Sequence, residues 1–372
     1  CIRDSFPDEL NQRPEILAHH YLKAGRQNLA LDYLEKAATR TLSQSNYKEG
    51  INYLRQALKL VDENPDTDQR IEREIRLQTA LGGALIATKG FAHEETGAIY
   101  SRAADLVNRV GGDTSPYNPV RYGVFVFNMV RSEFGVAHEL AKDFVSAVEG
   151  QGDETDHLLA YRIMGSCLTF MGVWEDSIHF LEQSIALYDI EKHKSLAVTY
   201  AQDPKIAALT LYSWSLLHRG RYEDALQAAD RAISEAHSFE HLHTTAYALG
   251  LAGTMFHQFY GDLARTREYA DDLVEMCMKQ PVPLWNNLGF CLQGWAIGMQ
   301  GDPVEGIKQM EKGYDGFSGT GARLFMAYYC TLKAELHIAA DDAHKAIECI
   351  SQARSVQEEN EEGWFAVDIH RA

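Results

Sequence analysis

The chain has 372 residues, 45% of them hydrophobic, which is enough for a large core or a long repeat array and excludes a disordered chain. Its 53 acidic residues against 35 basic ones give a net charge of −18, and no segment is rich in Lys or Arg, so nucleic acid is not expected as a direct partner. The six cysteines are scattered without CxxC pairs, which indicates reduced, buried thiols in a cytoplasmic protein.

A repeated pattern follows residues 1–13, which have no apolar stretch typical of a signal peptide and which we expect to be a spacer from a preceding module. In the clearest copy, a turn glycine is followed by an aromatic residue and then by small residues: Gly220, Tyr222, Ala225, Ala229 and Ala232. In chain order, the other copies begin at or near Gly25, Tyr47, Phe134, Gly172, Gly261, Gly301 and Asp341. The pattern predicts about eight to nine units across residues 14–372.

The spacing of the pattern predicts how the units pack. From Ala137 onward, equivalent small residues follow at steps of 40, 48, 41, 40 and 40 residues. Twelve residues before each of the last five stands another small residue: Gly165, Ser213, Thr254, Gly294 and Ala334. Two helices that cross closely need small side chains on both partners at the crossing. We therefore expect an all-α chain of helix-turn-helix units, stacked as a solenoid with a period near 40.

The 48-residue step contains eight extra residues in the stretch Tyr188–Ile206. Insertions in solenoids often lie at the binding face, so the polar residues Tyr200, Gln202 and Asp203 are candidates for contact with a ligand. In a second interpretation, Asp203 is the N-cap of a helix that has Pro204 in its first turn. The two interpretations are compatible.

The later stretches are interpreted from their composition. Val282–Gly301 is uncharged and about as long as a membrane span, but its four side-chain amides favour a buried helix of a soluble protein, with no membrane partner. Gly319–Gly321 is expected in a loop with glycine at turn positions. We expect Glu358–Gly363 to be a solvated acidic turn, and residues 361–372 to begin the first helix of a unit that is cut off.

The repeat pattern resembles a known class. Small residues at the helix crossing, Gly-x-aromatic at the turn and then A-x-x-x-[AL]-x-x-A resemble the tetratricopeptide repeat, whose usual period is about 34 residues. The segments RPEILAHHYLKAG, LQTALGGALIATKGF, YAQDP and LGFCLQGWAIGMQG resemble, more narrowly, a bacterial signal-transduction family. Its members join an adenylate/guanylate cyclase, a kinase or a DNA-binding module to an AAA/STAND ATPase and end in such repeats. The resemblance covers about Arg13 to Ala372 and implies a right-handed solenoid.

The resemblance also implies a regulatory role. The sequence has no GxxxxGK[ST] phosphate loop and no GxSxG, HExxH or GxGxxG motif, so it is expected to catalyse nothing and to need no cofactor. We expect a sensory or scaffold region that binds a partner protein or peptide in its concave groove and contacts an upstream ATPase module. The alternative ligand is a small-molecule effector, a metabolite or a sugar. Self-association into a homo-oligomer is compatible with both.

Candidate groove residues follow from the helical register. In tetratricopeptide repeats, the inner face of each first helix lines the groove, and residues three or four positions apart share that face. The candidates are Tyr122, Arg162, Thr210, Trp214, Gln258, Trp295, Tyr328 and Glu335. The two tryptophans suit stacking on a ligand ring, or else they pack between units. The histidines His237, His241 and His243 have no nearby cysteine and are not expected to bind a metal.

Overall fold

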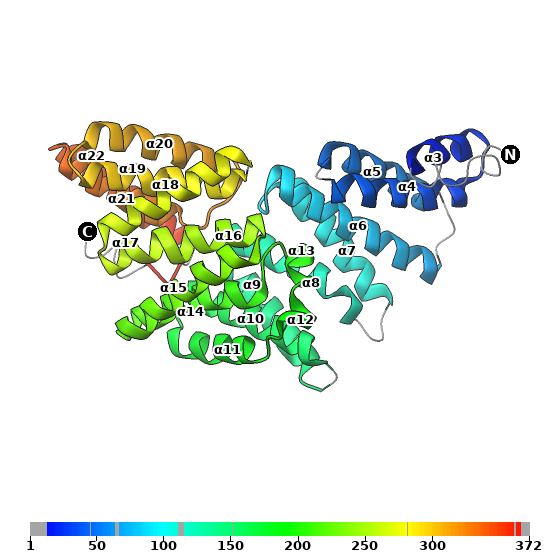
Figure 1. Ribbon diagram of the computed structural model, residues 1–372, viewed down its shortest axis with the longest axis horizontal. Coiled ribbons are helices and arrows are strands. Elements are labelled where there is room, and N and C mark those ends of the chain that lie inside the picture. Colours follow the sequence, from blue (N-terminus) through cyan, green and yellow to red (C-terminus); the bar gives the residue numbers. More distant parts are fainter. Residues whose placement is uncertain are drawn as a thin grey trace. The chain divides into compact units, whose positions relative to one another are not determined.

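The computed structural model describes residues 13–44, 46–63, 67–110, 115–150, 152–280, 282–360 and 362–365. The regular elements in these residues are all helices (Figure 1). None of the described helices is long and apolar enough to span a bilayer. The chain divides into two compact units, Cys1–Val124 and Phe125–Ala372, which we call the first and the second unit. The predicted spacer lies outside the described residues except for Arg13.

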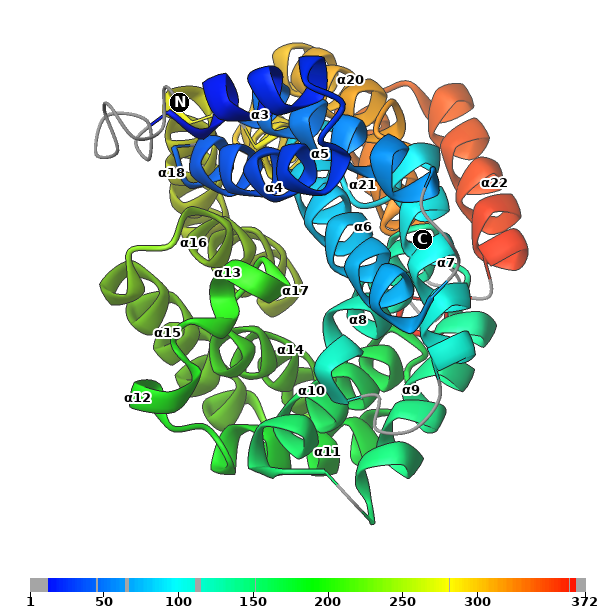
Figure 2. The ribbon, with the colours of Figure 1, turned by 90° about the vertical axis from the view of Figure 1, so that its right-hand side faces the viewer.

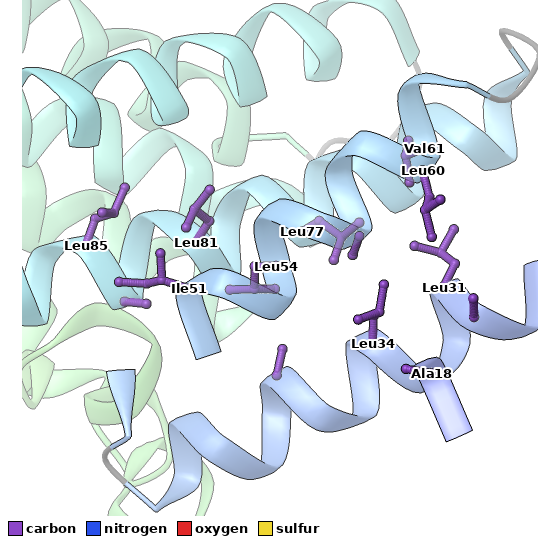
Figure 3. Packing of buried hydrophobic residues seen from close by; sticks show 14 residues of the cluster. Ala18, Leu31, Leu34, Ile51, Leu54, Leu60, Val61, Leu77, Leu81 and Leu85 are labelled. Atoms are coloured by element: carbon purple, nitrogen blue, oxygen red, sulfur yellow. The ribbon is translucent and has the colours of Figure 1, made fainter. Parts of the chain in front are cut away.

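The first unit is a series of helices that pack on their neighbours in the chain: α3 (Pro14–Lys23), α4 (Gln27–Ser43), α5 (Tyr47–Asp62), α6 (Asp68–Lys89), α7 (Glu94–Val110), η1 (Ser115–Tyr117) and the start of α8 (Asn118–Val130). Buried residues recur with helical spacing along α4 and α5, which places them on one stripe of each helix. Leucines such as Leu34, Leu54 and Leu81 point toward one another from α4, α5 and α6 (Figure 3). The core of this unit is therefore mainly aliphatic.

The second unit continues with longer helices and a few short ones: the rest of α8, α9 (Phe134–Val148), α10 (Glu154–Phe170), α11 (Trp174–Ala186), α12 (Ile190–His193), α13 (Leu196–Tyr200), α14 (Pro204–His218), α15 (Tyr222–Phe239), α16 (Leu242–Ala248), η2 (Leu249–Met255), α17 (Phe256–Tyr260), α18 (Leu263–Lys279), α19 (Pro283–Met299), α20 (Pro303–Ser318), α21 (Met326–Ala339) and α22 (Ala343–Asn360). In Figure 2, α10 and α14 lie side by side, and α11 packs on both. Successive helices pair as hairpins, as the repeat pattern predicts.

The turns of these hairpins explain the recurring glycine. Gly172, Gly220, Gly261 and Gly301 all have φ between +75° and +115°, a left-handed conformation that glycine adopts without steric cost. Asp341 occupies the equivalent turn with φ +60°, so that copy departs from glycine while keeping the same backbone. The predicted turns are therefore confirmed, and each one ends the first helix of a hairpin.

The paired small residues lie at the helix crossings, as predicted. The hydroxyl of Ser177 on α11 donates to the carbonyl oxygen of Gly165 on α10 at 3.0 Å. Between α19 and α20 the backbones approach still more closely, because a Cβ on Gly306 would lie 2.7 Å from the carbonyl oxygen of Gly294. Larger side chains at these positions would separate the two helices.

The inserted stretch forms the short helices α12 and α13 and then starts α14. The Oδ1 of Asp203 accepts the Ile206 N–H at 2.9 Å, and Pro204 is the first helical residue, which confirms the N-cap interpretation. The uncharged stretch that begins at Val282 forms α19, the predicted buried helix. The described cysteines are free and buried, as expected, and Cys1 lies outside the described residues.

The end of the described chain corrects two expectations. Residues 362–365 are not helical, so this part of the predicted further helix is absent; residues 361 and 366–372 lie outside the described residues. The expected solvated acidic turn is also wrong at Glu362, which has no exposed surface. The reason is that the chain after α22 folds back onto other helices of the second unit.

Candidate functional site

An aromatic cluster marks the inner face of the second unit, which we define as the face where the first helices of successive hairpins bring their side chains together. The cluster takes its rings from α10, α14, α17, α21, the loop before α21 and the stretch after α22: Phe170, Trp214, Phe259, Phe325, Tyr328, Trp364 and Phe365. Neighbouring ring centroids lie 5.0 to 6.3 Å apart, mostly edge-on or tilted, a favourable arrangement for aromatic pairs. We call these residues the inner aromatic cluster.

Residues Glu362–Phe365, which we call the docked segment, lie on this face. The Trp364 N–H donates to the carbonyl oxygen of Phe170 at 3.2 Å, which ties the segment to the end of α10. Its indole ring lies 5.3 Å from the ring of Trp214 and 5.7 Å from that of Phe325. Trp364 is only 2% exposed. A stretch without helical structure is thus held by one backbone hydrogen bond and by ring contacts.

Glycine is required at the centre of the docked segment. A Cβ on Gly363 would lie 2.1 Å from the carbonyl oxygen of Met171 and 2.7 Å from its carbonyl carbon. These are backbone atoms of the α10–α11 turn, which cannot rotate away as a side chain would. The segment therefore approaches this turn at a distance that only glycine permits.

The acidic end of the docked segment is buried among neutral groups. The carboxylate of Glu362 accepts the hydroxyl of Ser132 at 2.9 Å and the side-chain amide of Asn360 at 3.4 Å. Burial raises the pKa of Glu362 to about 7, against an ordinary value of 4.5. The hydrogen bonds from Ser132 and Asn360, the nearby Trp364 side chain and the charge of Arg323 favour the ionised form and offset part of this shift.

Trp214 joins α14 to an irregular helix. Its indole N–H donates to the carbonyl oxygen of Leu251 at 3.0 Å. Leu251 belongs to η2, a π-helical stretch in which that carbonyl also accepts the Phe256 N–H. Such wide helical turns occur mostly as single-turn bulges and are frequent at functional sites. The indole is thus fully paired, and Trp214 has no exposed surface.

Arg162, a further predicted groove residue, forms a buried polar pair with Gln202 of the insertion. A guanidinium nitrogen of Arg162 on α10 donates to the amide oxygen of Gln202 at 2.6 Å, and both side chains are buried. Next to Gln202, the backbone N–H of Asp203 donates to the hydroxyl of Thr244 at 2.9 Å. Burial raises the pKa of Asp203, while hydrogen bonds from Tyr188 and the backbone oppose the rise. The insertion thus meets α10 through Gln202.

Four of the remaining predicted residues form two hydrogen-bonded pairs, and Thr210 and Tyr200 are buried. The Tyr328 hydroxyl donates to the amide oxygen of Gln258 at 2.8 Å, and the indole N–H of Trp295 donates to Glu335 at 2.6 Å. Thr210 is fully buried, with its hydroxyl on the carbonyl oxygen of Ile206, and Tyr200 is also buried.

Tyr122 is buried in the first unit, and the other predicted groove residues belong to the second unit. Trp214 and Tyr328 share the inner aromatic cluster, which the sequence interpretation of one inner row anticipates.

The predicted open groove needs correction at Trp214 and Tyr328. Neither side chain is exposed, because the docked segment and the loop before α21 cover the face on which they lie. That loop is held by N–H groups of Arg323 and Leu324, which donate to the carbonyl oxygen of Val130 at 2.9 and 3.1 Å. For Trp214, the interpretation as a packed residue therefore describes this structure. Whether the candidates bind a ligand stays a prediction.

Sequence reasoning missed Phe170 on the inner face and the residues that cover this face: Phe325, Glu362, Trp364 and Phe365. The available signal was a pair of large aromatic residues directly after an acidic turn and a glycine. Two adjacent aromatic side chains are too apolar for a solvated turn, so this pair indicated a buried anchor.

Comparison with known proteins places this geometry in context. No protein-family model matches the chain. A curated relative, an uncharacterized protein of Rhizobium meliloti (strain 1021), is 22% identical over 358 residues, which make up 95% of this chain and 34% of the relative. The chain thus spans about a third of the length of this relative.

Solved structures of similar shape are helical repeat proteins. A Rap protein complexed with Competence and Sporulation Factor has a TM-score of 0.61 at 10% identity, over 88% of this chain and 87% of its own. The Rap conjugation gene regulator of the plasmid pLS20, in complex with a Phr peptide, has a TM-score of 0.57 at 11% identity, over 88% and 97%.

A STAND protein with a tetratricopeptide repeat sensor from Pyrococcus horikoshii has a TM-score of 0.49 at 13% identity, over 88% of this chain and 49% of its own. The two Rap likenesses confirm the predicted fold, an all-α, tetratricopeptide-like helical solenoid.

Proposed function

We propose that the second unit binds a partner protein through an extended peptide segment, which lies on the inner face of α10, α14, α17 and α21. The observation that carries this proposal is the docked segment. It is a non-helical stretch held on that face by the Trp364–Phe170 backbone hydrogen bond and by aromatic contacts. Stacked helical repeats form extended surfaces suited to such ligands, and this face already holds one.

The structural comparisons support a peptide ligand. One of the similar Rap proteins is a complex with a Phr peptide, and its fold matches across most of both chains. A peptide ligand also agrees with the composition of the face, where aromatic anchors dominate. Buried aromatic residues supply most of the binding energy in many protein interfaces.

A small effector that stacks on Trp214 is less well supported. A ligand-stacking indole needs at least one accessible ring face. Trp214 has no exposed surface and contacts Phe170, Phe259, Phe325 and Trp364. Its only polar atom already donates to Leu251. We therefore retain the peptide ligand as the proposal.

At the level of the whole protein, we propose a non-catalytic sensory or scaffold region that regulates an attached ATPase module of a bacterial signalling protein. The support is the resemblance of its sequence segments to that family, together with a relative about three times as long as this chain. A bound peptide changes the state of such a module only by binding one state more tightly than the other.

The proposal is tested by selecting peptides from a random displayed library against the full chain and measuring their affinity by fluorescence polarisation. Phe259→Ala, which alters the inner aromatic cluster, should weaken the selected peptides about tenfold or more. Tyr222→Ala, on the exposed side of α15, is the matched control and should leave their affinity unchanged. The proposal fails if no peptide is selected, or if the selected peptides ignore Phe259→Ala while circular dichroism shows the variant folded.

A further inference from the structure

We infer that the peptide recognised by this face carries an acidic residue, a glycine and two consecutive aromatic residues, and that Glu362–Phe365 occupies the site as an internal competitor. This inference rests on the proposed function and adds to it the chemistry of the partner and the event that must precede binding. It follows from the complementarity between the docked segment and each part of the face that it touches.

The two aromatic residues of the segment contact rings from several helices. Trp364 lies among Phe170, Trp214 and Phe325, with centroids 5.3 to 6.3 Å away. Phe365 lies 5.0 Å from the ring of Tyr328 in an edge-on contact. These rings come from α10, α14, α21 and the loop before α21, and together they form one receptor for two adjacent aromatic side chains.

The two positions before the aromatic pair are also selected. Gly363 passes over the backbone of Met171 at a distance that excludes a Cβ, so a partner peptide needs glycine there. Ser132 donates a hydrogen bond to Glu362, and Arg323 adds a favourable charge. Neither residue is part of the docked segment, so both would serve an acidic residue of a partner equally well.

The internal segment fits this face imperfectly, which makes it displaceable. The Oε2 of Glu362 and the indole nitrogen of Trp364 are buried without an aligned hydrogen-bond partner among the described residues. A buried polar atom left in this way lowers the stability of the docked state. A separate peptide is not tied to α22, so it can shift these two groups slightly while its glycine stays over Met171, and it can thereby satisfy both atoms.

The test uses the full chain and a variant that expels the segment without changing the face. Gly363→Ala forces a Cβ against the Met171 backbone only while the segment is docked. Gly135→Ala, in α9 with nothing within 4 Å of its added Cβ, is the matched control. The probe is a fluorescein-labelled peptide of residues 358–365, EENEEGWF, beside the same peptide ending in two alanines.

We expect Gly363→Ala to bind the EENEEGWF probe about tenfold more tightly than the unchanged chain or Gly135→Ala. The reason is that the probe binds only those molecules whose site is open, so a docked segment lowers the apparent affinity in proportion to the fraction of open sites. The alanine-ended peptide should not bind. Chymotrypsin should also cut faster after Trp364 or Phe365 in Gly363→Ala. The double variant Trp364→Ser, Phe365→Ser, checked for folding by circular dichroism, is a second route to an open face and should show the same gain.

Equal probe affinity in all these chains would overturn the competitor role, and failure of the probe to bind any of them would overturn the peptide chemistry. The latter result leaves the proposed function standing if library-selected peptides still bind in a manner that depends on Phe259. If those peptides also fail, the proposed function falls with the inference.

Discussion

Two buried carboxylates show how differently the two units close their interiors. In the first unit, Glu74 on α6 is 2% exposed and pairs with two guanidinium groups, Arg102 at 2.8 Å and Arg70 at 3.2 Å. In the second unit, Glu362 is equally buried, but its hydrogen bonds come from a hydroxyl and an amide, those of Ser132 and Asn360. One carboxylate is matched by full positive charges, and the other is held mainly by neutral donors.

The difference extends to the apolar cores. The first unit packs aliphatic side chains from consecutive helices, so its contacts are local in the sequence (Figure 3). The second unit places rings from distant parts of the chain against one another, including a segment without regular structure. Local, charge-matched packing is typical of a fixed scaffold. An aromatic face covered by an extended segment suits the exchange of its occupant that we propose.

The largest effect that separates the two units is expected for Trp214→Ala. Removing this ring leaves a large cavity in the inner aromatic cluster and should lower the free energy of unfolding of the second unit by about 4 kcal/mol. Hydrogen exchange measured by mass spectrometry should show faster exchange in α10, α14 and α21 than in α4 and α5. Leu34→Ala, in the first core, should give the reverse pattern with a loss of about 3 kcal/mol. Uniform acceleration in both variants would mean that the two cores do not respond separately.

A somewhat smaller effect is expected at the closest helix crossing. In Gly306→Ala, the new Cβ meets backbone atoms of Gly294 and Gly298 at 2.7 Å, so α19 and α20 must separate, at a cost of about 3 kcal/mol. Gly83→Ala, on α6 of the first unit, has nothing within 4 Å and should instead stabilise its helix by about 0.5–1 kcal/mol. Urea unfolding monitored by circular dichroism measures both. A neutral Gly306→Ala would contradict the close crossing.

The comparison of these glycines also explains what the sequence reveals. Small residues paired at a helix crossing recur in five successive hairpins, from Gly165 with Ser177 to Ala334 with Ala346, and this periodic trace predicts the hairpins. The cap formed by Asp203 and Pro204 is likewise local, because the residues that make it are neighbours in the sequence. Features with a local or periodic cause could therefore be predicted.

The covering of the inner face has neither a local nor a periodic cause in the sequence. Trp214 meets Trp364 only because the hairpins bring distant residues together, and one sequence carries no trace of that contact. The candidate residues Trp214 and Tyr328 could be placed on one inner face by helical register, but their burial could not. Glu362 was misinterpreted for the same reason: a run of acidic residues is usually solvated, and only the fold-back after α22 buries this one.

An intermediate effect is expected when the charge match of the first unit is removed. Glu74→Gln removes the carboxylate that Arg102 and Arg70 share, while Arg70 keeps its pair with Asp62 at 3.3 Å. The change should lower the free energy of unfolding by about 2 kcal/mol, less than for a fully buried pair because Arg102 is 44% exposed. Asp230→Asn breaks an exposed pair with Arg265 in the second unit and should change stability by less than about 0.5 kcal/mol. If both variants lose equally little in urea unfolding, the charge match of Glu74 does not stabilise the first unit.

The smallest effect is a pH dependence of the docked segment. Glu362 has a pKa raised to about 7 when docked, whereas an exposed glutamate has its ordinary value of 4.5. Burial is the main cause; Ser132, Asn360, Trp364 and Arg323 oppose it. A raised pKa means that the docked state holds its proton more tightly. The contribution of protonated Glu362 is therefore complete below the lower pKa and is lost as pH rises through the higher one.

Linkage predicts that docking weakens about tenfold, or about 1.4 kcal/mol, from about pH 6 to about pH 8. Fluorine NMR of fluorotryptophan-labelled protein, with the Trp364 signal assigned by Trp364→Phe, reports the docked and undocked populations directly. Glu362→Gln keeps the shape of the side chain and cannot ionise, so its populations should stay constant across this range. If the docked population of the wild-type chain is equally insensitive to pH, ionisation of Glu362 does not weaken docking. The docked segment would then be a fixed part of the second unit, as the packed helices are in the first unit.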